Sequence, residues 1–205
     1  MERKTPLYQT HVDAGGKIVE FGGFLMPVQY PTGVLAEHMA VRQKAGLFDV
    51  SHMGELRLKG PDAVANVQKL ITADISTMQD GDIKYAMFCN DAGGILDDFI
   101  VYRCAADDYW LVVNAGNRDK DAAWVESHLF GDVDYRDEGD DWGQVALQGP
   151  KSGDILKKLC AEQYIPAKYY TFIDNVPLDL GSRTIHALVS QTGYTGEYGF
   201  EIYCK

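Results

Sequence analysis

Residues 84–103 read KYAMFCNDAGGILDDFIVYR, and this stretch decides the fold of the segment around it. Two apolar runs, Lys84–Cys89 and Ile95–Arg103, flank the polar connection Asn90–Gly94. Because Asn and Gly tolerate the positive φ angles that tight turns need, the three parts together predict a β-hairpin.

The residues on either side of this hairpin predict a regular order of strands and helices. Upstream, Glu55–Lys59 alternates polar and apolar residues like a half-buried strand, and Gly60-Pro61-Asp62 then opens a helix. Downstream, the pattern predicts a strand, a helix and a last strand at Tyr109–Val113, Asn117–Leu129 and Val133–Tyr135. We interpret residues 54–136 as the split βα-ββ-αβ arrangement of ferredoxin-like units.

The flanking segments also mix strands and helices. Residues 18–30 look strand-like, a helix is predicted from about Val34 with Gly46 as its C-cap, and Leu47–His52 reads as extended. Three further strands are predicted at Tyr169–Asp174, Arg183–Ser190 and Gly199–Tyr203. The fold class predicted for the chain is therefore α+β with antiparallel strands.

One short pattern occurs twice. Leu58-Lys59-Gly60-Pro61 leads to Lys69, and Leu147-Gln148-Gly149-Pro150 leads to Lys158 with the same spacing from Gly to Lys. The pattern predicts a strand that enters a helix through Gly-Pro. Two copies are equally compatible with an internal repeat and with independent use of Pro at a helix start.

Composition excludes several classes of function. The 205 residues carry a formal net charge of −11, which argues against a nucleic-acid partner. No apolar run is long enough to cross a membrane and no secretory signal is visible, so we expect a cytoplasmic or mitochondrial-matrix protein. The cysteines Cys89, Cys104, Cys160 and Cys204 form no CxxC pair and the histidines form no metal-ligand pattern; reduced thiols and no metal site are expected.

Three segments carry candidate functional groups. Asp97 and Asp98 are neighbours in an apolar strand, so their side chains must point to opposite faces, and one of them can face a pocket. Gly193–Ile202 forms a glycine-rich turn that offers the ring of Tyr194 and, on the next strand, the carboxylate of Glu201. Asn114 ends a strand, where its amide could bind a ligand, whereas Asn117 reads as a helix N-cap. Each of these features is also compatible with an ordinary surface or turn role.

Taken in order, the motifs of the chain resemble those of the glycine-cleavage T-protein family. The matching motifs cover nearly the whole chain: Thr5-Pro6-Leu7-Tyr8, Pro27-Val28-Gln29-Tyr30, Leu47-Phe48-Asp49-Val50-Ser51-His52-Met53, Gly93-Gly94-Ile95-Leu96-Asp97-Asp98, Ala146-Leu147-Gln148-Gly149-Pro150 and Gly193-Tyr194-Thr195-Gly196-Glu197. The resemblance implies an aminomethyltransferase that moves a methylene carbon from the lipoyl arm of H-protein to tetrahydrofolate and releases ammonia.

The same resemblance implies roles for residues and domains. Asp98 would be the catalytic acid, and the folate would be bound by Met53, Tyr85, Val112, Asn114, Tyr194 and Glu201. Residues 54–136 would be the second domain, and residues 1–53 with 137–205 would form a discontinuous first domain. Members of the family continue into a C-terminal β-barrel domain that is absent here, so we expect the chain to keep much of the pterin site and to turn over weakly.

Other assignments remain open from the sequence. A folate-dependent enzyme of the dimethylglycine or sarcosine type would share much of the fold but take a different one-carbon donor. A non-catalytic folate-binding relative that serves iron–sulfur maturation carries a cysteine near the Gly-Tyr-Thr-Gly-Glu motif, where this chain has Gly193. A plain α+β interaction module would bind no folate.

Overall fold

The structure is a computed structural model that describes residues 2–205. The chain divides into two compact units. The first unit combines the chain up to His52 with Gly143–Lys205, and the second unit is Met53–Trp142. The second unit is therefore an insertion between the two parts of the first.

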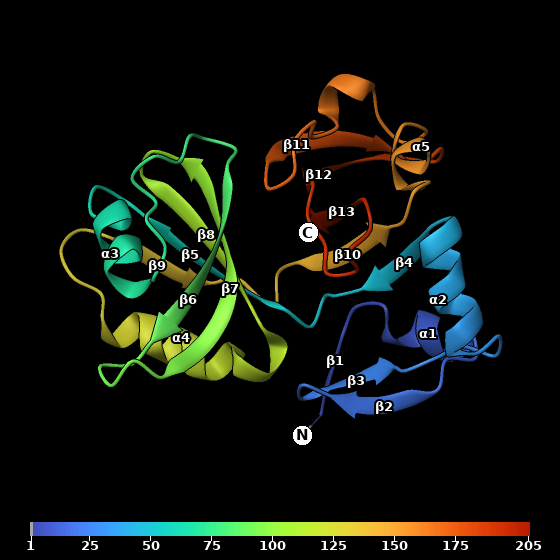
Figure 1. Cartoon of the computed structure of the whole chain (residues 1–205), viewed down its shortest axis with the longest axis horizontal. Helices are drawn as coiled ribbons and strands as arrows, with labels where there is room; N and C mark the ends of the chain where they lie inside the picture. Colours follow the sequence, from blue (N-terminus) through green and yellow to red (C-terminus); the bar gives the residue numbers. More distant parts are fainter. Residues whose placement is uncertain (1) are drawn as a thin grey trace. The chain divides into compact units, whose positions relative to one another are not determined.

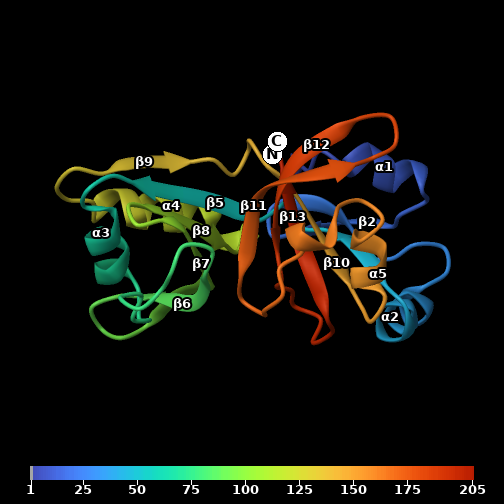
Figure 2. The ribbon, with the colours of Figure 1, turned by 90° about the horizontal axis from the view of Figure 1, so that it is seen from above.

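The second unit is a five-stranded sheet with the order β6-β7-β8-β5-β9, and all of its pairings are antiparallel. Figure 2 shows β9 alongside β5 at one edge of this sheet. The strands are β5 (Gly54–Lys59), β6 (Ile83–Cys89), β7 (Ile95–Ala105), β8 (Asp108–Val113) and β9 (Asp134–Asp137). The helices of the unit are α3 (Ala63–Leu70), the 3₁₀ turn η1 (Ala115–Asn117) and α4 (Arg118–Ser127).

The predicted hairpin is present as β6 and β7, drawn in green in Figure 1, and the Asn90 amide donates to the Gly94 carbonyl across the turn at 2.9 Å. All five strands predicted for this unit are present. β5, α3, β7, β8, α4 and β9 form the predicted βαββαβ arrangement, and β6 adds a fifth strand beside β7 at the edge of the sheet.

Both helices of the second unit cover the same face of its sheet. Alternate side chains of the strands point to this face and form a buried core with α3 and α4, which includes Leu56, Leu58, Phe88, Phe99, Val101, Leu111, Val67 and Val125. The period of two along a strand then sends the intervening side chains to the other face.

The first unit contains two sheets. The larger has the order β11-β12-β13-β10-β4 and comprises β4 (Gly46–Asp49), β10 (Gly143–Gln148), β11 (Phe172–Asp179), β12 (Thr184–Ser190) and β13 (Gly199–Cys204). The smaller sheet comprises β1 (Arg3–Lys4), β3 (Phe24–Pro27) and β2 (Ile18–Phe21). The remaining elements are α1 (Tyr8–Asp13), α2 (Val34–Gln43), α5 (Ser152–Leu156) and η2 (Glu162–Tyr164). The predicted α+β class with antiparallel strands is confirmed.

The predicted end of helix α2 was wrong. The helix ends at Gln43 with Lys44 in the C-cap position, and Gly46 is the first residue of β4. A Cβ at Gly46 would lie 2.6 Å from Cγ2 of Val41, so a tight approach of the strand to the helix requires the glycine. Packing between two elements explains this glycine, not the termination of a helix.

The repeated Gly-Pro segments adopt the same local conformation. Gly60 has φ of 130° and Gly149 has φ of 120°, values that favour glycine. In each case the glycine carbonyl accepts a hydrogen bond from the amide three residues later, that of Ala63 or Ser152, at 3.0 Å. Helices α3 and α5 therefore begin through the same turn, although α5 is shorter.

Candidate functional site

The two neighbouring aspartates of β7 lie on opposite faces of the sheet, as the alternation predicted. Asp97 points to the face covered by helices and is 4% exposed. Asp98 points to the other face and is exposed. A buried carboxylate needs hydrogen-bond partners inside the protein, so Asp97 requires them, whereas Asp98 is accessible to a ligand.

Asp98 has a specific partner on the neighbouring strand. The hydroxyl of Tyr85, on β6, donates a short hydrogen bond to Oδ2 of Asp98. Strand register explains the contact, because Asp98 faces Met87 and Tyr85 lies two residues from Met87 on the same side of β6. Tyr85 is itself 50% exposed, so the pair offers an aromatic ring and an oriented carboxylate at the surface of this unit.

Asp97 is the centre of a buried network that the sequence did not reveal. Its carboxylate accepts hydrogen bonds from the main-chain amide of Asn114 at 3.1 Å and from Nδ2 of Asn114 at 3.0 Å. It also accepts a bond from Nδ2 of Asn117 at 2.5 Å. Asn117 stands at the N-cap position of α4, but within the described chain its side chain forms no capping bond. The predicted N-cap position of Asn117 is confirmed, and its side chain binds Asp97 instead of the helix main chain.

The two remaining predicted site residues of the second unit are Val112 and Met53. Val112 lies on β8 between Ile100 and Glu55, and its side chain is 1% exposed. Met53 immediately precedes β5 and is half-buried.

The first unit holds the other predicted residues, Tyr194 and Glu201. Tyr194 lies in the loop before β13 with its ring fully exposed. The half-buried carboxylate of Glu201, on β13, accepts hydrogen bonds from the hydroxyl of Thr192 and from Nε2 of Gln144 at 3.1 Å. Burial raises the pKa of Glu201, and these two hydrogen bonds act in the opposite direction.

The loop that carries Tyr194 is held by Gln148 of β10. Nε2 of Gln148 donates to the carbonyl of Thr192 at 3.0 Å, and its Oε1 accepts from the hydroxyl of Thr195 at 2.8 Å. A Cβ at Gly193 would lie 2.1 Å from Oε1 of Gln148, and a Cβ at Gly199 would lie 2.5 Å from its side-chain carbon. The glycines of the motif therefore make room for this glutamine.

Replacing Gly193 with alanine is expected to destabilise the protein by about 2 kcal/mol or more, because the new Cβ overlaps Gln148 and φ is 155°. The matched control is Gly196→Ala, where φ is 71° but no atom lies within 4 Å of the new Cβ, so a loss of about 1 kcal/mol is expected. Urea unfolding of both variants measures the difference. Equal losses would show that Gln148 does not constrain the loop.

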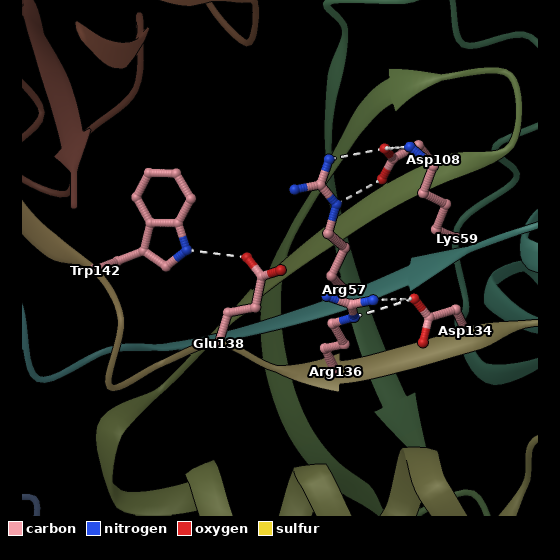
Figure 3. Close-up of polar contacts among 7 residues, drawn as sticks. All are labelled: Arg57, Lys59, Asp108, Asp134, Arg136, Glu138 and Trp142. Carbon is pink, nitrogen blue, oxygen red and sulfur yellow. Dashed lines mark hydrogen bonds and ion pairs between the residues drawn. The ribbon is translucent and has the colours of Figure 1, made fainter.

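A second polar cluster lies on the face of β5, β8 and β9 opposite α3 and α4 (Figure 3). Nε and Nη2 of Arg57 donate to the two carboxylate oxygens of Asp108 at 2.8 and 2.7 Å, and Nζ of Lys59 lies 3.2 Å from Asp108. Arg136 pairs with Asp134 at 2.8 Å. Arg57 and Lys59 of β5 pair with Asp108 of β8, whereas Arg136 and Asp134 pair within β9. Each of these three cations already faces a carboxylate, so the cluster does not offer an uncompensated charge to a ligand.

Burial raises the pKa of Glu55, which is 1% exposed, to about 9, and the charge of Arg118 opposes this effect. The native state then binds a proton that the unfolded chain releases near pH 4.5, so stability should fall as pH rises from about 5 to 9. The slope from one group is at most about 1.4 kcal/mol per pH unit. Glu55→Gln should flatten this dependence in urea unfolding measured between pH 5 and 9; an unchanged slope would exclude Glu55 as its source.

A groove of about 660 Å³ in the first unit is lined in part by the hydrogen-bonded side chains of His11, Tyr30 and Asp49. Nδ1 of His11 lies 2.7 Å from the hydroxyl of Tyr30, and its Nε2 lies 2.8 Å from Oδ2 of Asp49. The hydroxyl of Thr5 donates to the same oxygen at 2.6 Å. These hydrogen bonds join α1, the segment that follows β3, and strand β4. His52 packs against the rings of Phe21 and Phe24.

Among the described residues, no helix is long and apolar enough to cross a membrane. All four cysteines are free thiols.

Comparisons with known proteins agree with the predicted resemblance. Residues 7–205 match the family described as the GCVT N-terminal domain. The chain is 46% identical over 205 residues to the aminomethyltransferase of Bacillus licheniformis, covering 100% of this chain and 55% of the relative. It is 48% identical over 206 residues to that of Desulfitobacterium hafniense, covering 98% and 54%. The chain thus spans about half the length of these relatives.

Two solved structures resemble the fold. The glycine cleavage system aminomethyltransferase T from Bartonella henselae superposes with a TM-score of 0.87 at 34% identity, over 100% of this chain and 54% of that chain. Heterotetrameric sarcosine oxidase from Corynebacterium gives a TM-score of 0.58 at 17% identity, over 82% and 81%, which is a likeness of fold. Since the family match extends over almost the whole sequence, the chain belongs to the GCVT N-terminal domain family.

Proposed function

We propose that this chain forms the part of a glycine-cleavage aminomethyltransferase that binds tetrahydrofolate and carries the catalytic carboxylate, Asp98. The observation that carries the proposal is the exposed pair of Tyr85 and Asp98, in a chain whose relatives are named aminomethyltransferases. The full reaction would transfer a methylene carbon from aminomethyl-lipoyl H-protein to tetrahydrofolate and release ammonia, as a step of glycine catabolism and one-carbon metabolism.

Each unit, taken by itself, carries groups that suit the chemistry of a reduced pterin. A pterin has flat rings and an edge of alternating hydrogen-bond donors and acceptors. The half-exposed ring of Tyr85 and the fully exposed ring of Tyr194 suit packing against such rings. The amide of Asn114 and the carboxylate of Glu201 suit its polar edge, and an ionised Glu201 would form charge-assisted bonds with N–H donors.

Asp98 suits the chemical step of the proposed reaction. The amine nitrogen that accepts the carbon would be supplied by tetrahydrofolate. An ionised Asp98 can accept a hydrogen bond from an amine, take its proton and stabilise positive charge that develops nearby. The Tyr85 hydroxyl holds one oxygen of this carboxylate and leaves lone pairs on the other for a ligand.

The partner in the proposed reaction is H-protein, whose lipoyl group carries the one-carbon unit. The relatives reported above come from bacteria, and we place the reaction in a bacterial cytoplasm. A nucleic-acid or membrane partner forms no part of the proposal.

The experiment that tests the function supplies candidate donors to the complete protein that contains this chain. Aminomethyl-lipoyl H-protein, dimethylglycine and sarcosine are each incubated with tetrahydrofolate, and methylenetetrahydrofolate and ammonia are measured. The proposal requires product from the H-protein donor. Product from a methylamine donor instead would favour the dimethylglycine or sarcosine type of enzyme, and an absence of folate binding by calorimetry would favour a plain interaction module.

A further inference from the structure

We propose that Asp97, the buried member of the Asp97-Asp98 pair, is a positioning residue that holds the amide of Asn114 with its oxygen outward. Asn114 would then act toward a ligand as a hydrogen-bond acceptor. This inference rests on the proposed function in one respect, because it takes the ligand to be a reduced folate that presents an N–H donor to Asn114.

The orientation of Asn114 follows from the two atoms that its amide nitrogen contacts. Nδ2 of Asn114 lies 3.0 Å from Oδ1 of Asp97 and 2.7 Å from the main-chain carbonyl oxygen of Asp98. Both atoms can only accept hydrogen bonds when Asp97 is ionised. A flipped amide would place Oδ1 of Asn114 against two oxygens, so both N–H groups point inward and both are used.

The carboxylate of Asp97 is in turn held by two further donors. The main-chain amide of Asn114 and Nδ2 of Asn117 both donate to it. Oδ1 of Asn117 accepts a bond from Nζ of Lys120 at 2.8 Å, and the same ammonium donates to the carbonyl of Leu96. The network therefore fastens the strand segment that carries Asp98 to the start of α4.

Asp121 of α4 lies beside Lys120 of this network. Its side chain is fully buried, and its two carboxylate oxygens have no hydrogen-bond partner among the described residues. Burial and the neighbouring Asp97 raise the pKa of Asp121 to about 8, and Lys120, with Nζ 4.0 Å from Oδ1, opposes the shift.

Calorimetric titration of the 205-residue chain with tetrahydrofolate tests the role of Asp97. Asn114→Ala is expected to weaken binding about tenfold through the loss of the acceptor, and Asp97→Ala by a similar factor. The double variant should bind about as weakly as either single variant, because one residue acts through the other. Asp91→Asn, in the exposed hairpin turn, is the control and should bind normally. Full affinity of Asp97→Ala, or additive losses, would overturn the inference.

A measurement without ligand keeps the inference testable if the variants bind poorly or fold poorly. In the parent chain, NMR should show slow solvent exchange of the Asn114 side-chain NH₂ protons. Fast exchange would overturn the proposed orientation. A chain that binds no folate yet protects these protons would refute the proposed function while supporting the orientation of Asn114.

Discussion

Replacing Asp98 with asparagine is expected to slow one-carbon transfer by about a hundredfold or more, while the affinity for tetrahydrofolate changes by less than about threefold. Asparagine preserves the shape and can still accept the bond from Tyr85, but it can neither take a proton nor oppose positive charge. The measurement is single-turnover formation of methylenetetrahydrofolate from aminomethyl-lipoyl H-protein, made in a protein of the relatives' full length.

Two further variants make this result specific. Tyr85→Phe removes the hydroxyl that orients the carboxylate and should lower the rate by about tenfold, less than the loss at Asp98. Asp91→Asn changes an exposed carboxylate of the hairpin turn and should leave the rate unchanged. A transfer rate in Asp98→Asn within a few fold of the parent would remove Asp98 from the chemical step.

Replacing Asp49 with alanine is expected to destabilise the protein by about 3 kcal/mol. The side chain of Asp49 is 1% exposed. It accepts hydrogen bonds from the hydroxyl of Thr5 at 2.6 Å and from the amide of Ser51 at 3.0 Å. Nε2 of His11, when it carries the proton, donates a third at 2.8 Å. Alanine would leave these groups without their common acceptor. Urea unfolding at pH 7 measures the loss.

The control for Asp49 is Asp13→Ala on the exposed side of α1, which should change stability by less than about 0.5 kcal/mol. Burial by itself would raise the pKa of Asp49, but hydrogen bonds from Thr5, His11 and Ser51 hold it below the ordinary value. A lowered pKa means that the contribution of Asp49 is present above about pH 4 and is lost as pH falls further. The free energies of unfolding of the parent and of Asp49→Ala should therefore converge in acid. A difference between them that stays constant as pH falls would disprove the electrostatic account.

Local sequence patterns predicted most of the strands and helices. The turn chemistry of Asn90–Gly94 predicted the β6–β7 hairpin, because Asn and Gly accept positive φ whatever lies elsewhere in the chain. Alternation predicted that Asp97 and Asp98 point to opposite faces, because the period of a strand is local. The motif order predicted the family, which the match over residues 7–205 confirmed. Local patterns did not predict the part played by Gly46, because that depends on Val41 of the neighbouring helix.

The sequence by itself determined most of the strands and helices and that the two aspartates separate. Tertiary structure decided which of them is buried, because the inward face is the one that α3 and α4 cover. It also decided that Asp97 contacts Asn114 and Asn117, since pairing of β7 with β8 brings together segments about twenty residues apart. Hydrogen bonds of this kind join residues whose separation along the chain has no fixed period, so no local pattern encodes them.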